Sequence, residues 1–483
     1  MKKKKTASTR HPTPSQPTTP LVNQTAGTQK SKVFGFSQPQ LALIVGLVFC
    51  VVAAVLFATN LQFPVTHNFD EFHYVPSAKQ MLAGIENQNW EHPPLGKQLM
   101  AIGISLFGDR AIGWRFMSVV FGVITFGGML FWSWAFFESI ELMLFTGAIT
   151  LLNQLLFVQS RIGMLDTFMM AFLAWAFAFL AYTWKGGRDP KKIHLAWLSI
   201  GACLGLAIAS KWFGIIVWAY FLGLALMVVW FRSWGIQFKK PKRVQKIEDR
   251  GIEGVEVDEP WFSENLWAGT SLVVLAVAFI LVPVIVYLCT FIPFFFIDRN
   301  PPYAFLDLFR MQARMWDGQQ RVVTPHPYMS GWLGWPWLVR PIWYAFDHDK
   351  DLHGRDWVRG VLLLGNPFLM WGGMAAILYN FYQWLSTRSK SAFLIFTAWC
   401  ALYFTWGIIP RKINFYYYYY PAGMILSLAW TQALKEFRKT QPWVLWTVVG
   451  ASFVIFVYFY PILAAQRIAP DSFRKWMWFS SWI

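Results

Sequence analysis

Two adjacent carboxylates, Asp70 and Glu71, lie between His67 and His73, shortly after the first long apolar run of the chain. A carboxylate at a membrane boundary is costly unless it has a task or a partner. We therefore interpret Asp70 as a general base whose pKa is set by low-dielectric surroundings and by nearby cations. Two alternatives stay open. One is a solvated loop acid, and the other is a metal site of His67, Asp70 and His73, for which this loop spacing is not diagnostic.

A second polar segment follows the acidic pair and runs from Glu91 through His92 and two prolines to Lys97. The double proline forces a non-helical entry, because proline lacks a backbone N–H and fixes its own φ. The residues after it favour an amphipathic helix at the membrane surface over 95–107. The segment is therefore predicted to be a turn that leads into a surface helix.

The composition assigns most of the chain to a membrane. Of its 483 residues, 56% are hydrophobic and only 14% are charged, whereas about a quarter of the residues in soluble domains are charged. The apolar residues fall into runs of roughly 20, the length that a helix needs to cross the hydrocarbon core. A porin-like barrel is excluded, because barrel strands alternate in polarity and these runs do not.

About eleven such runs predict an all-α polytopic membrane protein with outward-facing amphipathic loop helices. The spans are predicted at 41–59, 112–135, 141–157, 164–184, 195–210, 212–231, 267–291, 361–384, 392–409, 417–434 and 443–463. The predicted regions are a disordered basic tail over 1–40, a catalytic transmembrane region over 41–290 with an outer loop at 60–111, an aromatic-rich outer loop over 291–360, a four-helix transmembrane region over 361–465 and an outer tail over 466–483.

The distribution of Lys and Arg orients these spans. The net charge of +17 would suggest nucleic acid in a soluble protein, but in a membrane protein it follows topology, and no nucleic-acid partner is expected. The short turns predicted outside hold only Arg161, Lys211, Arg411 and Lys412 among the basic residues, as the positive-inside rule requires. The N-terminus is therefore predicted to be cytoplasmic and the C-terminal tail to be outside.

The two long outer loops carry acids, His, Trp and Pro, and loops of this size are usually functional or disordered. Their aromatic content argues against disorder. The aromatic residues of the second loop are open to two interpretations, a membrane-interface belt or a platform for peptide and sugar. They include Trp332, Trp335, Trp337, Trp343 and Tyr344.

Taken together, Asp70-Glu71 after the first span and the segment from His92 to Lys97 resemble the protein O-mannosyltransferase family, polytopic glycosyltransferases that use lipid-phosphate sugar donors. The resemblance runs from about residue 40 to 465. The second outer loop is too short for the extra β-trefoil domain of the eukaryotic members, so the chain resembles a bacterial form. Further segments are similar to the family in the same order: Gln159 to Asp166, Ala209 to Gly214, His326 to Tyr328, Trp335 to Trp337, Arg340 to Tyr344, Gly365 to Pro367, and Arg411 to Pro421.

The resemblance implies a GT-C type glycosyltransferase that moves mannose from a polyprenyl-phosphate-mannose donor to Ser or Thr hydroxyls of unfolded or translocating polypeptides, with inversion. It also implies a multi-pass protein of the bacterial inner membrane, with membrane lipids around it and an active site facing the periplasm or exterior. Neither a cofactor nor a metal is expected.

Roles for single residues follow from the resemblance and from the chemistry of the step. Arg161, Lys211 and Arg411 are predicted to bind the donor phosphate, since a buried phosphate needs cations; taken singly, each could instead place its charge in the membrane interface. Asp70 is predicted to take the acceptor proton, and Glu71, which points elsewhere, to position the acceptor or the sugar. The residues predicted to position the substrates are His92, Lys97, Asp166, His326 and Asn366.

Two other functions compete with this interpretation. A transferase of the same architecture that moves a sugar onto a lipid or polysaccharide would share the acidic pair and the cations, but the segments at 326–328, 340–344 and 365–367 favour the protein mannosyltransferases. A membrane transporter would need ionisable residues near the middle of its spans and inverted repeats, and the sequence indicates neither.

Overall fold

The computed structural model describes residues 36–234, 266–267, 269–321, 323–351 and 353–483. The chain divides into two units, Met1–Leu41 and Ala42–Ile483. The predicted disordered tail at 1–40 lies outside the described residues except for 36–40, where residues 38–40 already begin the first helix.

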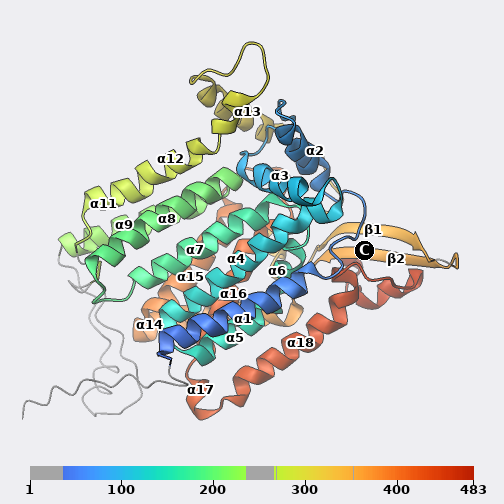
Figure 1. Cartoon of the computed structure of the whole chain (residues 1–483). Coiled ribbons are helices and arrows are strands. Elements are labelled where there is room, and N and C mark those ends of the chain that lie inside the picture. Colours follow the sequence, from blue (N-terminus) through green and yellow to red (C-terminus); the bar gives the residue numbers. More distant parts are fainter. Residues whose placement is uncertain (1–35, 235–265, 268, 322, 352) are drawn as a thin grey trace, which may run out of the picture. The chain divides into compact units, whose positions relative to one another are not determined.

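The unit Ala42–Ile483 is built around long apolar helices packed side by side (Figure 1). Among the described residues, seven helices are long and apolar enough to cross a membrane: α1 Gln38–Ala58, α4 Ala111–Phe137, α7 Leu165–Thr183, α8 Pro190–Ser210, α9 Gly214–Ser233, the composite helix Leu272–Phe296 and α18 Trp443–Leu463. The composite helix consists of α11 Leu272–Ala276, a π-helical turn Val277–Leu281, α12 Val282–Cys289 and the 3₁₀ turn Ile292–Phe296. The other bundle helices are α5 Ile140–Leu151, α6 Gln154–Gln159, α14 Pro367–Thr387, α15 Lys390–Phe404, α16 Tyr420–Leu434 and α17 Phe437–Thr440.

Each predicted span contains helix, and the predicted class of polytopic helical membrane protein is confirmed. The span predicted at 141–157 is nevertheless broken between α5 and α6. Asn153 causes the break, because its side chain accepts a hydrogen bond from the Leu155 N–H at 3.1 Å and so begins a new helix. The same side chain donates to the Gly423 carbonyl at 3.2 Å, which ties the break to α16. The count of about eleven spans stays a prediction.

A two-stranded hairpin in the second outer loop departs from the all-α prediction. β1 Ile342–Lys350 pairs antiparallel with β2 Asp356–Leu363, with a bulge between Trp343 and Ala345. The start of the span predicted at 361–384 was therefore wrong, since residues 361–363 end β2 and α14 begins at Pro367. Buried and exposed residues alternate along a half-buried strand. At the start of β1 this alternation is missing, because residues 342–345 are all buried.

Short helices form the rest of the outer loops. α3 Leu95–Phe107 has the predicted bounds and packs against α2 Glu71–Leu82. The second loop contributes α13 Asp307–Gln320, which rests on a small apolar cluster around Trp90 and Phe294. Single 3₁₀ turns lie at Trp332–Gly334, Thr405–Gly407, Tyr416–Tyr419, Pro470–Trp476 and Ser480–Trp482.

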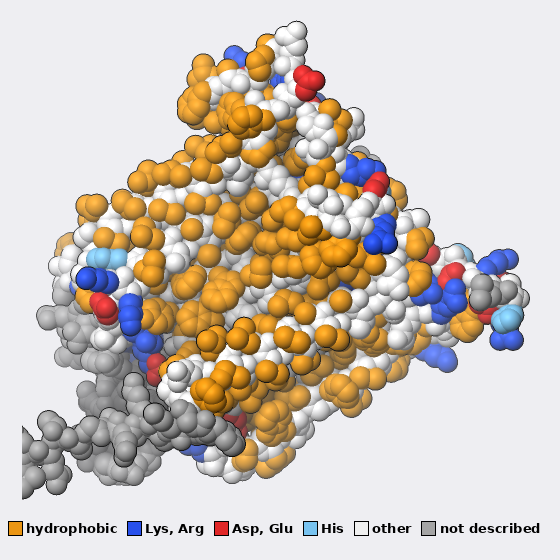
Figure 2. All heavy atoms as spheres, viewed as in Figure 1, with side chains coloured by type: hydrophobic (Ala, Val, Ile, Leu, Met, Phe, Trp, Pro, Cys, Tyr) orange, Lys and Arg blue, Asp and Glu red, His pale blue; other side chains and the backbone are white. Residues whose placement is uncertain are grey.

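The centre of the bundle is α7, which packs between α4 and α8. In the most apolar stretch of α7, 78% of the residues are buried, against 17% in α1. Close contact with α4 depends on Gly128, where an added Cβ would lie 2.9 Å from the Ala174 Cβ. Figure 2 shows hydrophobic side chains over the middle of the viewed face and charged ones towards the two ends of the helices. This pattern suits a helix bundle in a bilayer, where charged side chains lie at the two water-facing boundaries.

Candidate active site

The segments that carry most of the predicted site residues meet at one end of the bundle. α1 ends and both α4 and α7 begin at this end (Figure 1). α8 ends here as well, at Lys211, and the chain returns between α15 and α16 with Arg411. Because these connections share one end of the bundle, residues far apart in sequence can meet there and form one site.

Asp70 lies directly before α2 and is partly buried. Its Oδ2 accepts a hydrogen bond from the Tyr74 hydroxyl at 3.1 Å. Burial raises the pKa of the Asp70 carboxyl, while the charge of Lys211 and the Tyr74 hydrogen bond act in the opposite direction. The net result is a more basic carboxylate than an exposed Asp, as a general base requires.

Phe69, directly before Asp70, adopts φ +50°, a left-handed conformation that bulky residues rarely take. Aromatic rings from three segments surround it, at centroid distances of 5.1 Å to Tyr344, 5.4 Å to His326 and 5.7 Å to Phe415. This packing stabilises the strained residue. It thereby fixes the direction in which the chain presents Asp70.

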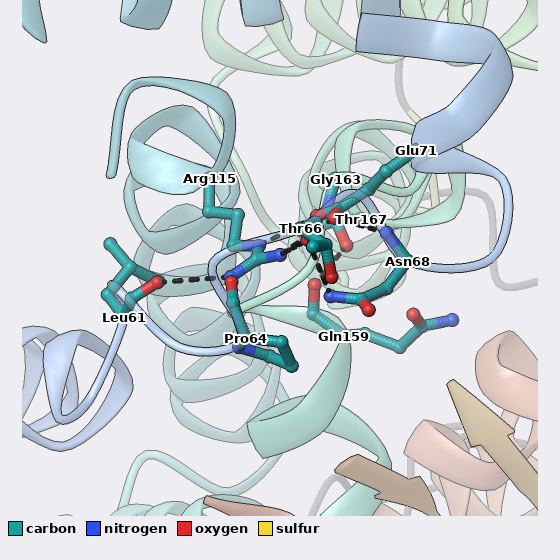
Figure 3. Close-up of polar contacts among 9 residues, drawn as sticks. All are labelled: Leu61, Pro64, Thr66, Asn68, Glu71, Arg115, Gln159, Gly163 and Thr167. Atoms are coloured by element: carbon teal, nitrogen blue, oxygen red, sulfur yellow. Dashed lines mark hydrogen bonds and ion pairs between the residues drawn. The ribbon is translucent and has the colours of Figure 1, made fainter. Parts of the chain in front are cut away.

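Glu71 is fully buried and forms a bidentate ion pair with Arg115 of α4 (Figure 3). Its Oε1 accepts from Arg115 Nε at 2.8 Å and from the Gly163 N–H at 2.7 Å, and its Oε2 accepts from Arg115 Nη2 at 2.8 Å and from the Asn68 N–H at 3.0 Å. Arg115 Nη1 also donates to the Pro64 carbonyl at 2.7 Å. Both carboxylate oxygens are thus used within the protein, and Glu71 anchors the loop that carries Asp70.

Lys211 and Asp166 form a second buried ion pair, and this one lies close to Asp70. Lys211 Nζ donates to the two Asp166 oxygens at 2.9 and 2.7 Å. The same ammonium lies over the rings of Tyr417 and Tyr418, at 4.8 and 5.1 Å from their centroids. One cation therefore faces two carboxylates, Asp70 and Asp166, both of which are within range of its charge.

Arg411 brings a second cation to the same aromatic pair. Its guanidinium carbon lies 5.1 Å from the centroid of the Tyr418 ring, which Lys211 also contacts. Its Nη1 donates to Gln319 Oε1 at 3.2 Å, and Gln319 Nε2 lies 3.2 Å from His92 Nδ1. Arg411 and His92 are thus joined through one glutamine from α13.

The two predicted histidines, His92 and His326, lie within range of the charges of this site. Burial lowers the pKa of His92 well below its usual value, and the charges of Lys211 and Arg411 lower it further. Burial also lowers the pKa of His326, against the opposing effect of Asp70. The structure therefore brings together Asp70, Asp166, Lys211, Arg411 and the two histidines.

Lys97 and Asn366 serve the framework around this pocket. Lys97 is fully buried, and its Nζ donates to Asn89 Oδ1 at 3.2 Å and to the His92 carbonyl at 3.0 Å, so that it holds the preceding turn. Asn366 is also fully buried; it caps α14 and donates to backbone carbonyls of α18 and of the residue that ends α5, at 3.0 and 3.1 Å. The Lys97 ammonium and the Asn366 side-chain amide are thus both engaged in hydrogen bonds within the protein.

Arg161 lies in the turn between α6 and α7 and is only 4% exposed. Its guanidinium carbon is 4.9 Å from the centroid of the Phe157 ring. Burial lowers the pKa of its guanidinium to about 10. Both terminal nitrogens are buried without a hydrogen-bond partner among the described residues. Arg161 is therefore a buried cation near the same end of the bundle that lacks a bound acceptor.

The alternative metal site is not assembled. Within the described ranges, no group of three or more His, Cys, Asp or Glu side chains could hold a metal ion. His67 packs instead against Trp114, with ring centroids 4.2 Å apart.

Three residues of the site were not predicted from the sequence: Arg115, Tyr74 and Gln319. Arg115 carried a signal, because it lies inside the span predicted at 112–135, and an ionisable residue in an apolar span needs a partner. Tyr74 lies four residues after Asp70, one helical turn away, which the helix start at Glu71 would have indicated. Nothing in the sequence distinguished Gln319.

Two family models match the chain. The model described as dolichyl-phosphate-mannose-protein mannosyltransferase matches residues 108–297, and the model described as the C-terminal four TMM region of protein-O-mannosyltransferase matches residues 304–482. Curated relatives agree with them. The chain is 26% identical to the polyprenol-phosphate-mannose–protein mannosyltransferase of Mycobacterium tuberculosis, over 86% of each chain. It is 24% identical to the protein of the same name from Corynebacterium glutamicum, over 86% of this chain and 88% of that one.

Solved structures are similar in fold. The S. cerevisiae protein O-mannosyltransferase Pmt1-Pmt2 complex bound to the sugar donor contains a chain that matches with a TM-score of 0.71 and 15% identity, over 92% of this chain and 93% of that one. ArnT from Cupriavidus metallidurans matches with a TM-score of 0.56 and 16% identity, over 90% and 68%. The two family models together cover residues 108–297 and 304–482, and the fold is shared over 92% of the chain, so the chain belongs to the protein O-mannosyltransferase family and is a membrane glycosyltransferase of the GT-C type.

Proposed function

We propose that this protein transfers mannose from a polyprenyl-phosphate-mannose donor to Ser or Thr hydroxyls of exported polypeptides, at the outer face of the bacterial inner membrane. The observation that carries the proposal is the meeting of a partly buried carboxylate, Asp70, with Lys211 and Arg411 at one end of the bundle. The names of the relatives supply the classes of donor and acceptor.

Lys211 and Arg411 are the proposed partners of the donor phosphate. Their charges lie over the same ring, Tyr418, and a phosphate between them would replace water as the acceptor of charge-assisted hydrogen bonds. Lys211 stays partly neutralised by Asp166. Arg161 is the third proposed cation, since its terminal nitrogens have no hydrogen-bond partner among the described residues.

The proposed reaction is a single displacement. The acceptor oxygen attacks the anomeric carbon on the side opposite to the phosphate, so that the new C–O bond forms as the bond from carbon to the phosphate oxygen breaks. Asp70 takes the hydroxyl proton. The phosphate leaves with the bonding electron pair and is stabilised by the fixed cations, so no general acid is needed. Attack from the opposite side inverts the anomeric centre.

The surroundings of Asp70 fit this role. The ion pair of Glu71 and Arg115 holds the loop on one side, and Phe69 is packed among rings of the other outer loop and of the segment before α16. This arrangement preorganises the base before the substrates bind, which lowers the entropic cost of reaching the reactive geometry. Glu71 is thus proposed to position the base, while His92 and His326 lie where neutral hydrogen-bonding groups could contact sugar or acceptor hydroxyls.

A reconstituted assay tests the proposed function. Full-length protein in lipid nanodiscs is incubated with radiolabelled polyprenyl-phosphate-mannose and a Ser/Thr-rich peptide, and the products are separated into peptide and lipid fractions. Label is expected in the peptide, released by β-elimination as expected for an O-linked sugar. A peptide of the same length with Ala at every Ser and Thr is the control. Label that appears in lipid or polysaccharide acceptors, with none in the peptide, would replace the proposal by the alternative transferase.

A further inference from the structure

A polar cavity of about 650 Å³ lies at the end of the bundle away from Asp70. The last residues of α4 and α7, the first residues of α15 and Arg438 of α17 line it. Since α4 and α7 begin at the end of the bundle where Asp70 lies, with Arg115 and Asp166 near their starts, their last residues lie at the opposite boundary. The cavity is therefore separate from the proposed active site.

The lining of this cavity carries an excess of positive charge. Among the described residues, the lining holds the cations Lys185, Arg188 and Arg438, together with Lys390, which has a further partner of its own, and one carboxylate, Glu138. Lys185 and Arg188 both pair with Glu138, at 2.7 and 3.3 Å. One carboxylate cannot neutralise two cations, so the cavity attracts an anion.

Membrane topology alone does not account for this arrangement. The positive-inside rule explains basic residues in the loops at one face, but it places no condition on where their side chains meet. Here the charges come from segments far apart in sequence, at 138, 185–188, 390 and 438, and line one hollow. A shared cavity indicates a ligand site more than a general bias of charge.

Part of the wall of the cavity is aromatic. Phe136, Phe137 and Trp184 supply this surface at the depth where α4 and α7 end. Gly187, in the turn beside them, has φ +71°, and apart from its two chain neighbours no described heavy atom lies within 4 Å of the position that a Cβ would take. Aromatic surface next to cations at a helix end suits an amphipathic ligand at the membrane interface.

We infer that this cavity binds the phosphate of an anionic phospholipid head group. A volume of about 650 Å³ lies in the range of small-molecule sites and exceeds the need of a free phosphate ion. The phosphodiester would lie among Lys185, Arg188 and Arg438, and the glycerol would lie against the aromatic wall. The inference does not depend on the proposed transferase activity, because no residue of the active site lines the cavity.

Lipid-dependent thermal unfolding of the purified full-length protein tests the inference. Phosphatidylglycerol added to the detergent-solubilised wild type is expected to raise its Tm by several degrees, and phosphatidylcholine is expected to leave it nearly unchanged, because only a ligand that prefers the folded state stabilises it. The double variant Arg188→Gln/Arg438→Gln should need roughly tenfold or more phosphatidylglycerol for half of the shift. The control variant Lys191→Gln/Lys192→Gln removes two exposed cations from the first turn of α8 and should respond as the wild type does.

Further arms separate the possible outcomes. If Arg188→Gln/Arg438→Gln does not fold, Lys185→Gln/Arg438→Gln keeps the ion pair of Arg188 with Glu138 and carries the same expectation. An equal response of wild type and pocket variants would overturn the inference, and so would an equal response to the two lipids. Glycerol 3-phosphate that protects the wild type as well as phosphatidylglycerol does would overturn the assignment to a lipid.

Discussion

At the scale of single residues, the decisive group is the Asp70 carboxylate. Asp70→Asn keeps the size of the side chain, and the amide oxygen can still accept the hydrogen bond from the Tyr74 hydroxyl. The amide cannot, however, take the proton from the Ser or Thr hydroxyl of the acceptor. Turnover is expected to fall about 10² to 10⁴-fold with donor binding largely intact. Single-turnover transfer to a Ser/Thr peptide measures the effect. Asp471→Asn, at an exposed carboxylate of the outer tail, is the matched control, and near-normal turnover of Asp70→Asn would remove Asp70 as the base.

The same residue sets a pH dependence. Burial raises the pKa of Asp70 above its ordinary value near 3.9. Only the ionised form accepts a proton, so the transfer rate should fall as pH decreases through this raised pKa. The midpoint of that fall is expected above about pH 4, in wild type and in Asp471→Asn alike.

The buried pair of Glu71 and Arg115 predicts strong coupling. Glu71→Gln or Arg115→Met leaves one charge buried without its partner, which costs on the order of 3 to 5 kcal/mol. The double variant should lose less folding stability than the sum of the losses of the two single variants, and thermal unfolding of all three measures the difference. The half-exposed pair of Lys79 and Asp109 gives the control, where Lys79→Gln should cost at most about 1 kcal/mol. Additive losses at Glu71 and Arg115 would show that the pair is not a unit.

The donor cations can be tested one at a time. Arg411→Ala removes a charge beside the proposed phosphate, and the loss of 2 to 5 kcal/mol typical for such a partner corresponds to about tenfold or much weaker donor binding. Lys412→Ala, at the exposed neighbour, should bind the donor as the wild type does. Arg161→Ala is expected to weaken binding as well. Normal donor binding by both Arg411→Ala and Arg161→Ala would place the phosphate elsewhere.

At the scale of elements, Lys97 connects α3 to the turn before it. Burial lowers the pKa of Lys97 to about 7. Between pH 7 and about 10 the unfolded chain binds a proton at this residue that the folded protein does not, so the contribution of Lys97 to folding stability rises with pH over this interval. In thermal unfolding across that range, Lys97→Met should lose this part of the slope, and Lys191→Met should keep it. If stability changed with pH equally in Lys97→Met and in the wild type, the lowered pKa of Lys97 would be contradicted.

The elements were predictable to the extent that their patterns are local. The bounds of α3 followed from two prolines and an amphipathic repeat, and the long apolar runs located the spans. The break at Asn153 was missed because its local cap to the Leu155 N–H lies within a continuous apolar run, and its tie to Gly423 in α16 is a long-range contact. The β1–β2 hairpin was missed because the start of its first strand, residues 342–345, is apolar and buried on both faces. In that stretch the burial shows no period of two.

At the scale of the whole molecule, the predicted topology puts the C-terminus on the outer side. A phosphatase fused after Ile483 should be active, since alkaline phosphatase folds only where its disulfides can form. Fusion at 187, in the turn that follows α7, should be inactive and serves as the control. An inactive reporter after Ile483 in a stably inserted fusion would contradict the odd number of spans.

The candidate site was predictable in its members more than in its contacts. Topology and family resemblance together named Asp70, Lys211 and Arg411, because each follows the predicted outer end of a span. That Asp166 pairs with Lys211 while Glu71 pairs with Arg115 could not be predicted, since these are long-range contacts set by the packing of α4, α7 and α8. The adjacent acids Asp70 and Glu71 thus have different surroundings: Glu71 is held by Arg115, and Asp70 accepts a hydrogen bond from Tyr74.

The ion pair between Glu71 and Arg115 also has a consequence for biogenesis. An arginine near the start of a membrane helix is expensive until its charge is matched. Its partner precedes it by only 44 residues, in the segment that joins α1 to α4. The match can therefore form once α4 has emerged, before α7 and the later helices are in place. We expect α1, the first outer loop and α4 to assemble as an early unit, onto which α7 docks when the Gly163 N–H reaches the same carboxylate.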